Sequence, residues 1–310
     1  MKILVTGGSG YIGSILVPEL IKLNHEVTVL DNFMYKQSSL NHLCVFENFK
    51  IINGDIRDKN LIKSLLKTND LIIPLAAIVG APLCSKDPFS AQSINHDAIA
   101  EMIKDASKDQ LIIMPTTNSA YGTGDKNNYC DENSILKPIS KYAIDKVEIE
   151  KLLMARENSI SYRLATVFGM SPRMRIDLLV NDFTYRAYHD SALIIFEGHF
   201  KRNYIHIRDV VNSFIHAINN MDQMKGEIYN VGLSDANLSK TELCHEIKKH
   251  LPNFTFVEEK IKKDPDQRNY IVSNVKIEKT GFLPKHSLSD GIKELIKGYT
   301  MLKNQNFGNF

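Results

Sequence analysis

Short apolar runs alternate with amphipathic stretches through the first half of the 310-residue chain. The apolar runs have the length of buried strands, and the stretches between them carry apolar residues at helical spacing. This alternation predicts an α/β fold, a doubly wound parallel sheet with helices on both faces. The predicted strands cover residues 2–6, 26–30, 49–53, 70–75, 110–115 and 159–165, and the predicted helices cover 11–23, 58–67, 89–107 and 139–157.

The alternation weakens beyond residue 168. We interpret this part as a smaller C-terminal α+β substrate domain, with one return of the chain to the main sheet. Its predicted helices cover residues 175–189, 208–220, 239–249 and 288–302, and its predicted strands 193–196 and 227–231. The expected units are a nucleotide-binding domain of residues 1–168 with a return segment at about 205–231, a substrate-binding domain of residues 169–204 and 232–303, and a frayed tail of residues 304–310.

Three glycines join the first predicted strand to the first predicted helix. Gly7 permits a tight turn, Gly10 lets the backbone approach a phosphate, and Gly13 lets the helix pack closely on the strand. A helix that begins behind such a turn can bind the pyrophosphate of a dinucleotide at its N-terminus. The alternative is a glycine-rich turn without a ligand, but the position directly after the first strand favours a Rossmann dinucleotide-binding domain.

An acidic residue, Asp31, ends the second predicted strand. In this position a carboxylate can accept both ribose hydroxyls of the adenosine half of NAD, and it would repel a 2′-phosphate. The next residue is Asn32 rather than Arg or Lys. The sequence therefore favours NAD over NADP as the cofactor.

Composition excludes several other classes of protein. The net charge of +2 gives no electrostatic reason to expect nucleic acid or a membrane as a partner. No apolar run approaches the roughly 18 residues of a membrane span, and a strand at residue 2 leaves no room for a signal peptide. The four cysteines match no metal-ligand spacing. We expect a cytoplasmic protein with free thiols and no metal.

A tyrosine and a lysine, Tyr142 and Lys146, lie four residues apart in a predicted helix and therefore on one helical face. The lysine can stabilise the phenolate and lower the pKa of the tyrosine. Thr117 follows the fifth predicted strand, where side chains point into the ligand crevice of a parallel sheet. The three form a proton-transfer set for an alcohol. The alternatives are an exposed Tyr–Lys pair and a threonine that caps a turn.

The order of these motifs resembles the extended short-chain dehydrogenases/reductases, the superfamily of NAD-dependent nucleotide-sugar epimerases and dehydratases. The resemblance covers about residues 2–300. The matching pieces are Thr6–Gly13 with its G-x-x-G-x-x-G spacing, Asp31, Gly54–Asp58, Leu75–Ala77, Thr117, Ala120–Gly122, Tyr142, Lys146, Arg163, Arg202–His206, Asp209–Val210 and Tyr229–Gly232.

The resemblance implies roles for these positions. Tyr142 would be the general base, Lys146 would also bind the nicotinamide ribose, and Thr117 would hydrogen-bond the reacting oxygen. It also implies tightly bound NAD and a homodimer or higher homo-oligomer formed through helices 89–107 and 139–157. The implied cofactor-binding residues are Gly7, Gly10, Tyr11, Ile12, Gly13, Asp31, Asn32, Asp55, Ile56, Leu75, Ala76, Ala77, Thr116, Tyr142 and Lys146.

The chain departs from the family where the substrate is expected. Pro74 stands where the family often has His, and Thr166 stands where Asn usually follows Arg163 by three residues. The second departure puts the usual diphosphate contact in doubt, and we expect Arg173 or Arg175 in the basic segment that follows to replace it. The candidate substrate-binding residues are Val79, Gly80, Thr117, Asn118, Thr166, Arg173, Arg175, Asn181, Arg202 and Arg268.

The resemblance implies oxidation of a nucleotide-sugar substrate at C4, a step that several reactions share. A 4,6-dehydratase would need Asp-Glu directly after Thr117, where this chain has Asn118 and Ser119. The segments Ala77–Cys84 and Ser171–Arg175 resemble a bacterial branch near enzymes that oxidise GDP-heptose at C4 for surface polysaccharide, including capsule. We therefore expect a protein similar to GDP-D-glycero-alpha-D-manno-heptose 4-dehydrogenase. The alternatives are a UDP-hexose 4-epimerase, a 4-reductase, and a catalytically inactive NAD-bound sensor or scaffold.

Overall fold

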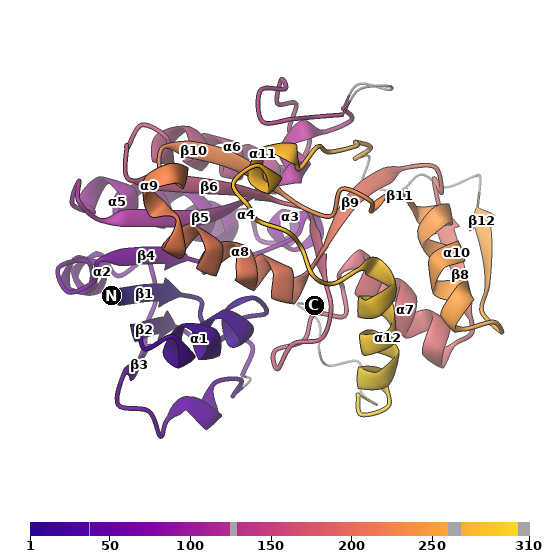
Figure 1. Cartoon of the computed structure of the whole chain (residues 1–310), viewed down its shortest axis with the longest axis horizontal. Helices are drawn as coiled ribbons and strands as arrows, with labels where there is room; N and C mark the ends of the chain where they lie inside the picture. The colour runs from indigo at the N-terminus through magenta and orange to yellow at the C-terminus, as the bar shows by residue number, and fades with distance from the viewer. Residues whose placement is uncertain (37, 125–128, 260–267, 303–310) are drawn as a thin grey trace.

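The structure of the protein, a computed structural model, describes residues 1–36, 38–124, 129–259 and 268–302. The predicted frayed tail of residues 304–310 lies outside this part of the chain. A parallel seven-stranded sheet in the order β10-β6-β5-β4-β1-β2-β3 forms its centre (Figure 1). The strands are β1 (Lys2–Thr6), β2 (Glu26–Asp31), β3 (Phe49–Asn53), β4 (Leu71–Pro74), β5 (Leu111–Thr117), β6 (Ser159–Leu164) and β10 (Glu227–Val231).

Helices cover both faces of this sheet because its inner strands are apolar on both sides. In β1, Ile3 and Val5 face a core that includes α1 (Gly13–Lys22) and α8 (Ile207–Asn219). Leu4 between them faces a second core, which includes α2 (Lys59–Leu66), α5 (Ala98–Asp105) and α6 (Lys141–Leu153). The doubly wound Rossmann-type fold predicted from the sequence is confirmed, and parallel pairing brings the carboxyl ends of the strands to one edge.

The helix predicted at 89–107 is interrupted. It consists of α4 (Pro88–Gln92), a π-helical segment Ser93–Asp97, and α5. A π-helical segment inserts an extra residue into the helical ladder and is frequent at functional sites. Short α3 (Ala81–Lys86), which the sequence pattern did not predict, precedes it.

The chain beyond the sixth strand builds a second, smaller group of elements, at the right of Figure 1. Two small sheets belong to it, one of order β11-β9-β7 and one in which β12 pairs with β8. β10 returns to the central sheet beside β6.

The remaining strands of the chain are β7 (Thr166–Phe168), β8 (Ala192–Phe196), β9 (Lys201–His206), β11 (Asn237–Ser239) and β12 (Thr255–Glu259). The remaining helices are α7 (Leu179–His189), α9 (Met221–Met224), α10 (Lys240–His250), α11 (Val275–Glu278) and α12 (Leu288–Tyr299). No helix in the described ranges is both long enough and apolar enough to span a bilayer.

A buried ion pair fastens α6 to the sheet. Glu150 on α6 and Arg163 on β6 are each 3% exposed, and their Oε1 and Nη2 atoms are 2.6 Å apart. The Glu150 carboxylate also accepts hydrogen bonds from the hydroxyls of Thr116, at 3.0 Å, and Ser161, at 2.7 Å. The helix that carries Tyr142 is thus fixed against β5 and β6 by charge as well as by apolar packing.

Arg163→Met should therefore destabilise the protein strongly, because it leaves the Glu150 carboxylate buried without its counter-ion. We expect a loss of about 3–5 kcal/mol in the free energy of unfolding, measured by urea denaturation. The control is Arg186→Met, which removes an arginine paired with Asp182 but 53% exposed, and it should cost less than about 1 kcal/mol. Equal losses in the two variants would contradict a structural role for the buried pair.

Candidate active site

The glycine turn after β1 approaches its neighbours so closely that side chains do not fit. A Cβ atom at Gly7 would lie 2.6 Å from the backbone nitrogen of Ala76, and one at Gly13 would lie 2.4 Å from the carbonyl oxygen of Gly8. Gly7 also has a φ of +67°, in the left-handed region that favours glycine. Ile12 packs against the apolar core. The turn therefore presents bare backbone in front of α1, which fits a dinucleotide pyrophosphate.

Two carboxylates, Asp31 and Asp55, line a pocket that the glycine turn also lines. Asp31 accepts hydrogen bonds from the backbone N–H of Ser9 and of Phe33, both at 2.9 Å, and so is fixed against the glycine turn. The Arg57 guanidinium, 2.7 Å from Asp55, holds the pKa of the Asp55 carboxyl below its usual value. Both groups suit the polar hydroxyl and amine groups of an adenosine.

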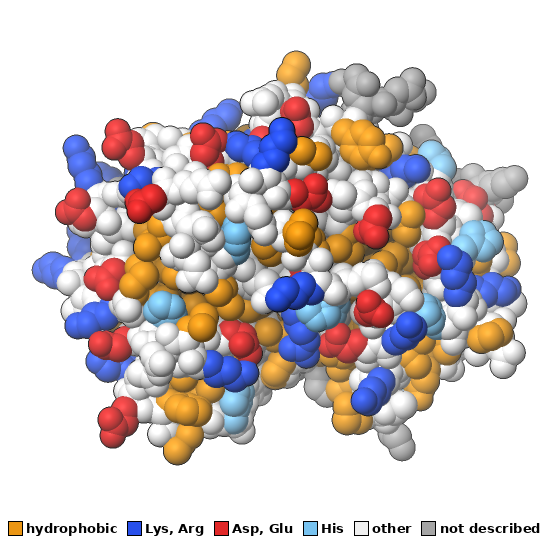
Figure 2. Space-filling view, viewed as in Figure 1, with side chains coloured by type: hydrophobic (Ala, Val, Ile, Leu, Met, Phe, Trp, Pro, Cys, Tyr) orange, Lys and Arg blue, Asp and Glu red, His pale blue; other side chains and the backbone are white. Residues whose placement is uncertain are grey.

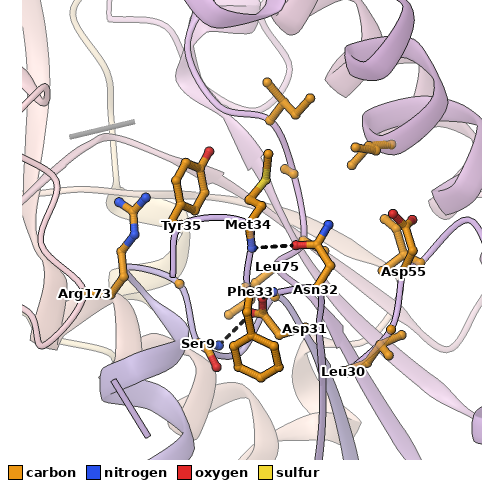
Figure 3. A pocket seen from close by; sticks show the side chains of 18 of the residues that line it. Ser9, Leu30, Asp31, Asn32, Phe33, Met34, Tyr35, Asp55, Leu75 and Arg173 are labelled. Carbon is orange, nitrogen blue, oxygen red and sulfur yellow. Dashed lines mark hydrogen bonds between the residues drawn. The ribbon is translucent and has the colours of Figure 1, made fainter. Parts of the chain in front are cut away.

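A pocket opens beside the turn, at the carboxyl edge of the sheet (Figure 3). Its lining joins residues that are far apart in the sequence. The predicted cofactor residues that line it are Gly7, Gly10, Asp31, Asn32, Asp55, Ile56, Leu75, Ala76 and Ala77. The residues that sequence reasoning did not assign to the cofactor are Ser9, Leu30, Phe33, Met34, Tyr35, Lys36, Gly54, Ile78, Ile94 and Arg173.

Tyr11, predicted to bind the cofactor, and Asn181, predicted to bind the substrate, connect the glycine turn to the second part of the chain. The Tyr11 hydroxyl donates a hydrogen bond to the carbonyl of Gly169 at 2.6 Å and accepts one from the Asn181 amide at 3.2 Å. The Asn181 side chain is fully buried and also binds the Gly169 N–H and the Arg175 carbonyl. Its amide thus joins segments of the chain to one another, and its contact with substrate stays a prediction.

The predicted catalytic residues come from two elements that meet at the site. β5 ends in Thr117, whose hydroxyl donates to the Ser119 hydroxyl at 3.0 Å. Tyr142 and Lys146 lie one turn apart on α6, and Lys146 Nζ donates to the carbonyl of Pro115 at 3.3 Å. The lysine is therefore held against the same strand that carries the threonine.

Two substrate candidates lie close to this group. Arg268 donates a hydrogen bond to the Ser119 hydroxyl, and its positive charge acts on the phenol of Tyr142. Asn118 is completely buried, and neither atom of its amide has a hydrogen-bond partner among the described residues. A buried amide without protein partners is a group that a polar ligand can satisfy.

The electrostatics of the site oppose ionisation of both catalytic side chains. Burial raises the pKa of Tyr142 from 10.0 to about 12, against the opposing charges of Arg175 and Arg268. Burial also lowers the pKa of Lys146 from 10.5 to about 8. In the protein by itself the pKa of Tyr142 is thus raised, whereas we expected it to be lowered. Burial is the dominant cause of the rise.

The hydroxyl of Thr116 belongs to the network that fixes α6, and its contact with the cofactor stays a prediction. Its hydroxyl donates to Glu150 and hydrogen-bonds Ser161 at 3.1 Å, inside the network that fixes α6. Alternate residues of a strand point to opposite faces, so Thr116 faces the helix and Thr117 the crevice side. The hydroxyl of Thr116 supports the floor of the site.

Sequence reasoning missed Asn95, which lies in the π-helical segment and is completely buried. Its amide binds both backbone atoms of Ile78, accepting from the N–H and donating to the carbonyl, each at 2.8 Å. The thiol of Cys84 donates to the same carbonyl at 3.3 Å. These contacts fix the segment after Ala77 that lines the pocket, and the sequence pattern, which predicted one continuous helix over 89–107, gave no signal for them.

The other substrate candidates are more dispersed. Arg175 forms an ion pair with Asp177 at 2.5 Å. Arg202 is 2% exposed, with its guanidinium 5.6 Å from the ring centre of Tyr270. Thr166 begins β7, and Val79 and Gly80 precede α3. Their contact with substrate stays a prediction. No group of three or more His, Cys, Asp or Glu side chains within the described ranges is placed to hold a metal ion.

Comparison with known proteins identifies the family. Residues 3–232 match the model of the NAD dependent epimerase/dehydratase family. The chain belongs to this family, and it is therefore an NAD-dependent enzyme of the nucleotide-sugar epimerase/dehydratase type, as the resemblance implied.

Particular relatives extend over nearly the whole chain. A UDP-N-acetyl-alpha-D-glucosaminuronate decarboxylase of Bacillus cytotoxicus is 27% identical, over 98% of this chain and 99% of that protein. A human dTDP-D-glucose 4,6-dehydratase is 26% identical, over 100% of this chain and 91% of that protein. The structure of UDP-glucose 4-epimerase from Thermotoga maritima with UDP-glucose is similar with a TM-score of 0.83, at 26% identity and over 98% of this chain and 100% of that one.

The depressed pKa of Lys146 gives a prediction about stability. Below pH 8 the ammonium is charged in the folded and unfolded states, so its burial destabilises the fold by up to about 3 kcal/mol. Between pH 8 and 10.5 the unfolded chain binds more protons, and this penalty disappears as the pH rises. Lys146→Met should therefore unfold at higher urea than the wild type at pH 7, and this advantage should shrink towards pH 10.5.

The control is Lys22→Met, which alters an exposed lysine on α1 and should show no such dependence on pH. Two results would contradict the burial penalty. One is a Lys146→Met variant that is less stable than the wild type at pH 7. The other is a difference in unfolding urea concentration between variant and wild type that is the same at pH 7 and at pH 10.5.

Proposed function

We propose that the protein oxidises the C4 hydroxyl of a nucleotide-activated sugar, with Tyr142 as the general base. The observation that carries the proposal is the convergence of β5 and α6: Lys146 reaches the backbone of the strand that ends in Thr117, one turn away from Tyr142. A phenol, an ammonium and a hydroxyl so placed can bind and deprotonate an alcohol.

Each of the three residues would have its own role in this step. Tyr142 takes the proton of the sugar hydroxyl, and the positive charge of Lys146 stabilises the phenolate that precedes this step. Thr117 hydrogen-bonds the reacting oxygen, and its present partner Ser119 holds its orientation. Oxidised NAD, held by the residues of the pocket, would supply the hydride acceptor. Among the residues present, the charges of Arg175 and Arg268 act against the burial that raises the pKa of Tyr142.

The first candidate substrate is a GDP-heptose, converted to its 4-keto sugar for surface polysaccharide. The support is the resemblance of Ala77–Cys84 and Ser171–Arg175 to that bacterial branch. The first segment includes the Ile78 backbone that Asn95 and Cys84 fix, and the second carries Arg175, whose charge acts on Tyr142.

The second candidate is 4-epimerisation of a UDP-sugar. It is favoured by the similarity over the full length to a structure of UDP-glucose 4-epimerase with UDP-glucose. Dehydration is disfavoured because Asn118 and Ser119 supply no carboxylate after Thr117. We also propose a homo-oligomer through α6 and its neighbours, supported by the exposed Ile144 and Leu152 on that helix.

Tyr142→Phe should lower kcat by about 10²–10⁴ while leaving the Kd for NAD within about twofold, since only the proton acceptor is lost. The matched control is Tyr129→Phe, at an exposed tyrosine, which should retain full activity. Full activity in Tyr142→Phe would contradict the mechanism, because it would show that another group removes the proton.

Products distinguish the two candidate reactions. Incubation with GDP-heptose and with UDP-glucose should give a ketone and reduced cofactor from the GDP-heptose, detected by mass spectrometry and by absorbance of NADH. A C4-inverted sugar without net reduction of the cofactor would contradict the dehydrogenase and establish the epimerase.

A further inference from the structure

An arginine from the second part of the chain reaches into the cofactor pocket. Arg173 follows β7 in the sequence, yet it lines the pocket beside the glycine turn (Figure 3). It is 2% exposed, and its guanidinium carbon lies 4.0 Å from the ring centre of Tyr35, which follows β2. The sequence led us to expect this arginine at the diphosphate of the substrate.

The segment that carries Arg173 is fastened to the glycine turn. The hydroxyl of Ser171 donates to the carbonyl of Tyr11 at 2.8 Å and hydrogen-bonds the hydroxyl of Ser14 at 2.8 Å. Arg173 itself donates to the carbonyl of Met174 at 3.0 Å. The guanidinium is therefore held close to the backbone that fits a pyrophosphate.

The two side chains that face each other are suited to an anion. Stacking on an aromatic ring uses the face of a guanidinium, whereas phosphate oxygens are bound by its edge. The Tyr35 hydroxyl is buried and has no hydrogen-bond partner among the residues that the structure describes. Burial lowers the pKa of Arg173, so its charge is one that a bound anion would stabilise.

We propose that Arg173 and Tyr35 form a clamp on the diphosphate of the bound dinucleotide. The guanidinium pairs with phosphate oxygens opposite the glycine turn, and the Tyr35 hydroxyl donates to the same group. Because the two residues belong to different parts of the chain, the clamp joins those parts across the cofactor and slows its release. The inference rests on the NAD dependence of the family and is independent of the sugar that is oxidised.

The test measures binding rather than turnover. Isothermal titration calorimetry with ADP-ribose probes the cofactor diphosphate, and titration with GDP and UDP probes a substrate diphosphate. Arg173→Met should raise the Kd for ADP-ribose about 10- to 100-fold and leave the Kd values for GDP and UDP within about twofold. Arg173→Lys should recover part of the loss, and Tyr35→Phe should show a smaller loss because it keeps the ring.

The surface variant Arg186→Met removes the same charge away from the pocket and corrects for long-range electrostatics. The dissociation rate of NADH, followed by stopped-flow fluorescence, should rise in Arg173→Met but not in this control. Weaker binding of GDP or UDP with unchanged binding of ADP-ribose would overturn the proposal and indicate that Arg173 binds the substrate diphosphate. Unchanged binding of all three ligands, or equally weakened binding of all three, would also overturn it.

Discussion

The rest of the structure depends on the close approach of the glycine turn to its neighbours. Gly7 and Gly13 leave no room for a Cβ atom, because Gly7 lies against the backbone of Ala76 and Gly13 lies against that of Gly8. Because Tyr11 in the same turn binds the carbonyl of Gly169, the cradle for a cofactor is also the joint between the two parts of the chain. A shift of this turn would move the pocket wall and the second part together.

The buried charges around the site differ in how they are compensated. Arg163 is balanced by Glu150, and the pair fixes α6 against the sheet. Lys146, on the same helix, has a backbone carbonyl as its hydrogen-bond acceptor and a pKa lowered by burial. The fold therefore tolerates an unfavourable ammonium next to a well-compensated ion pair, a distribution typical of sites where function opposes stability.

Most of the central fold could be predicted from the sequence, because buried parallel strands and amphipathic helices leave strong periodic patterns. The close approach of the glycine turn could be predicted equally well, since it follows from backbone geometry and position. The interrupted helix at Ser93–Asp97 was not, because a π-helical insertion keeps the composition of an ordinary helix. The role of Asn95 depends on that insertion and on a contact with Ile78, seventeen positions earlier in the chain.

The segment Arg173–Arg175 shows why the rest of the site could not be predicted. Two arginines of the same charge stand two positions apart, and a sequence gives no reason to assign them to different ligands. Folding pairs Arg175 with Asp177, two residues further on, but sets Arg173 against Tyr35, which is remote in sequence. The distinction arises from the fastening of Ser171 to the glycine turn, which places one guanidinium over the dinucleotide pocket. Long-range hydrogen bonds between neutral side chains and backbone, which charge patterns do not reveal, thus decide which residues surround each arginine.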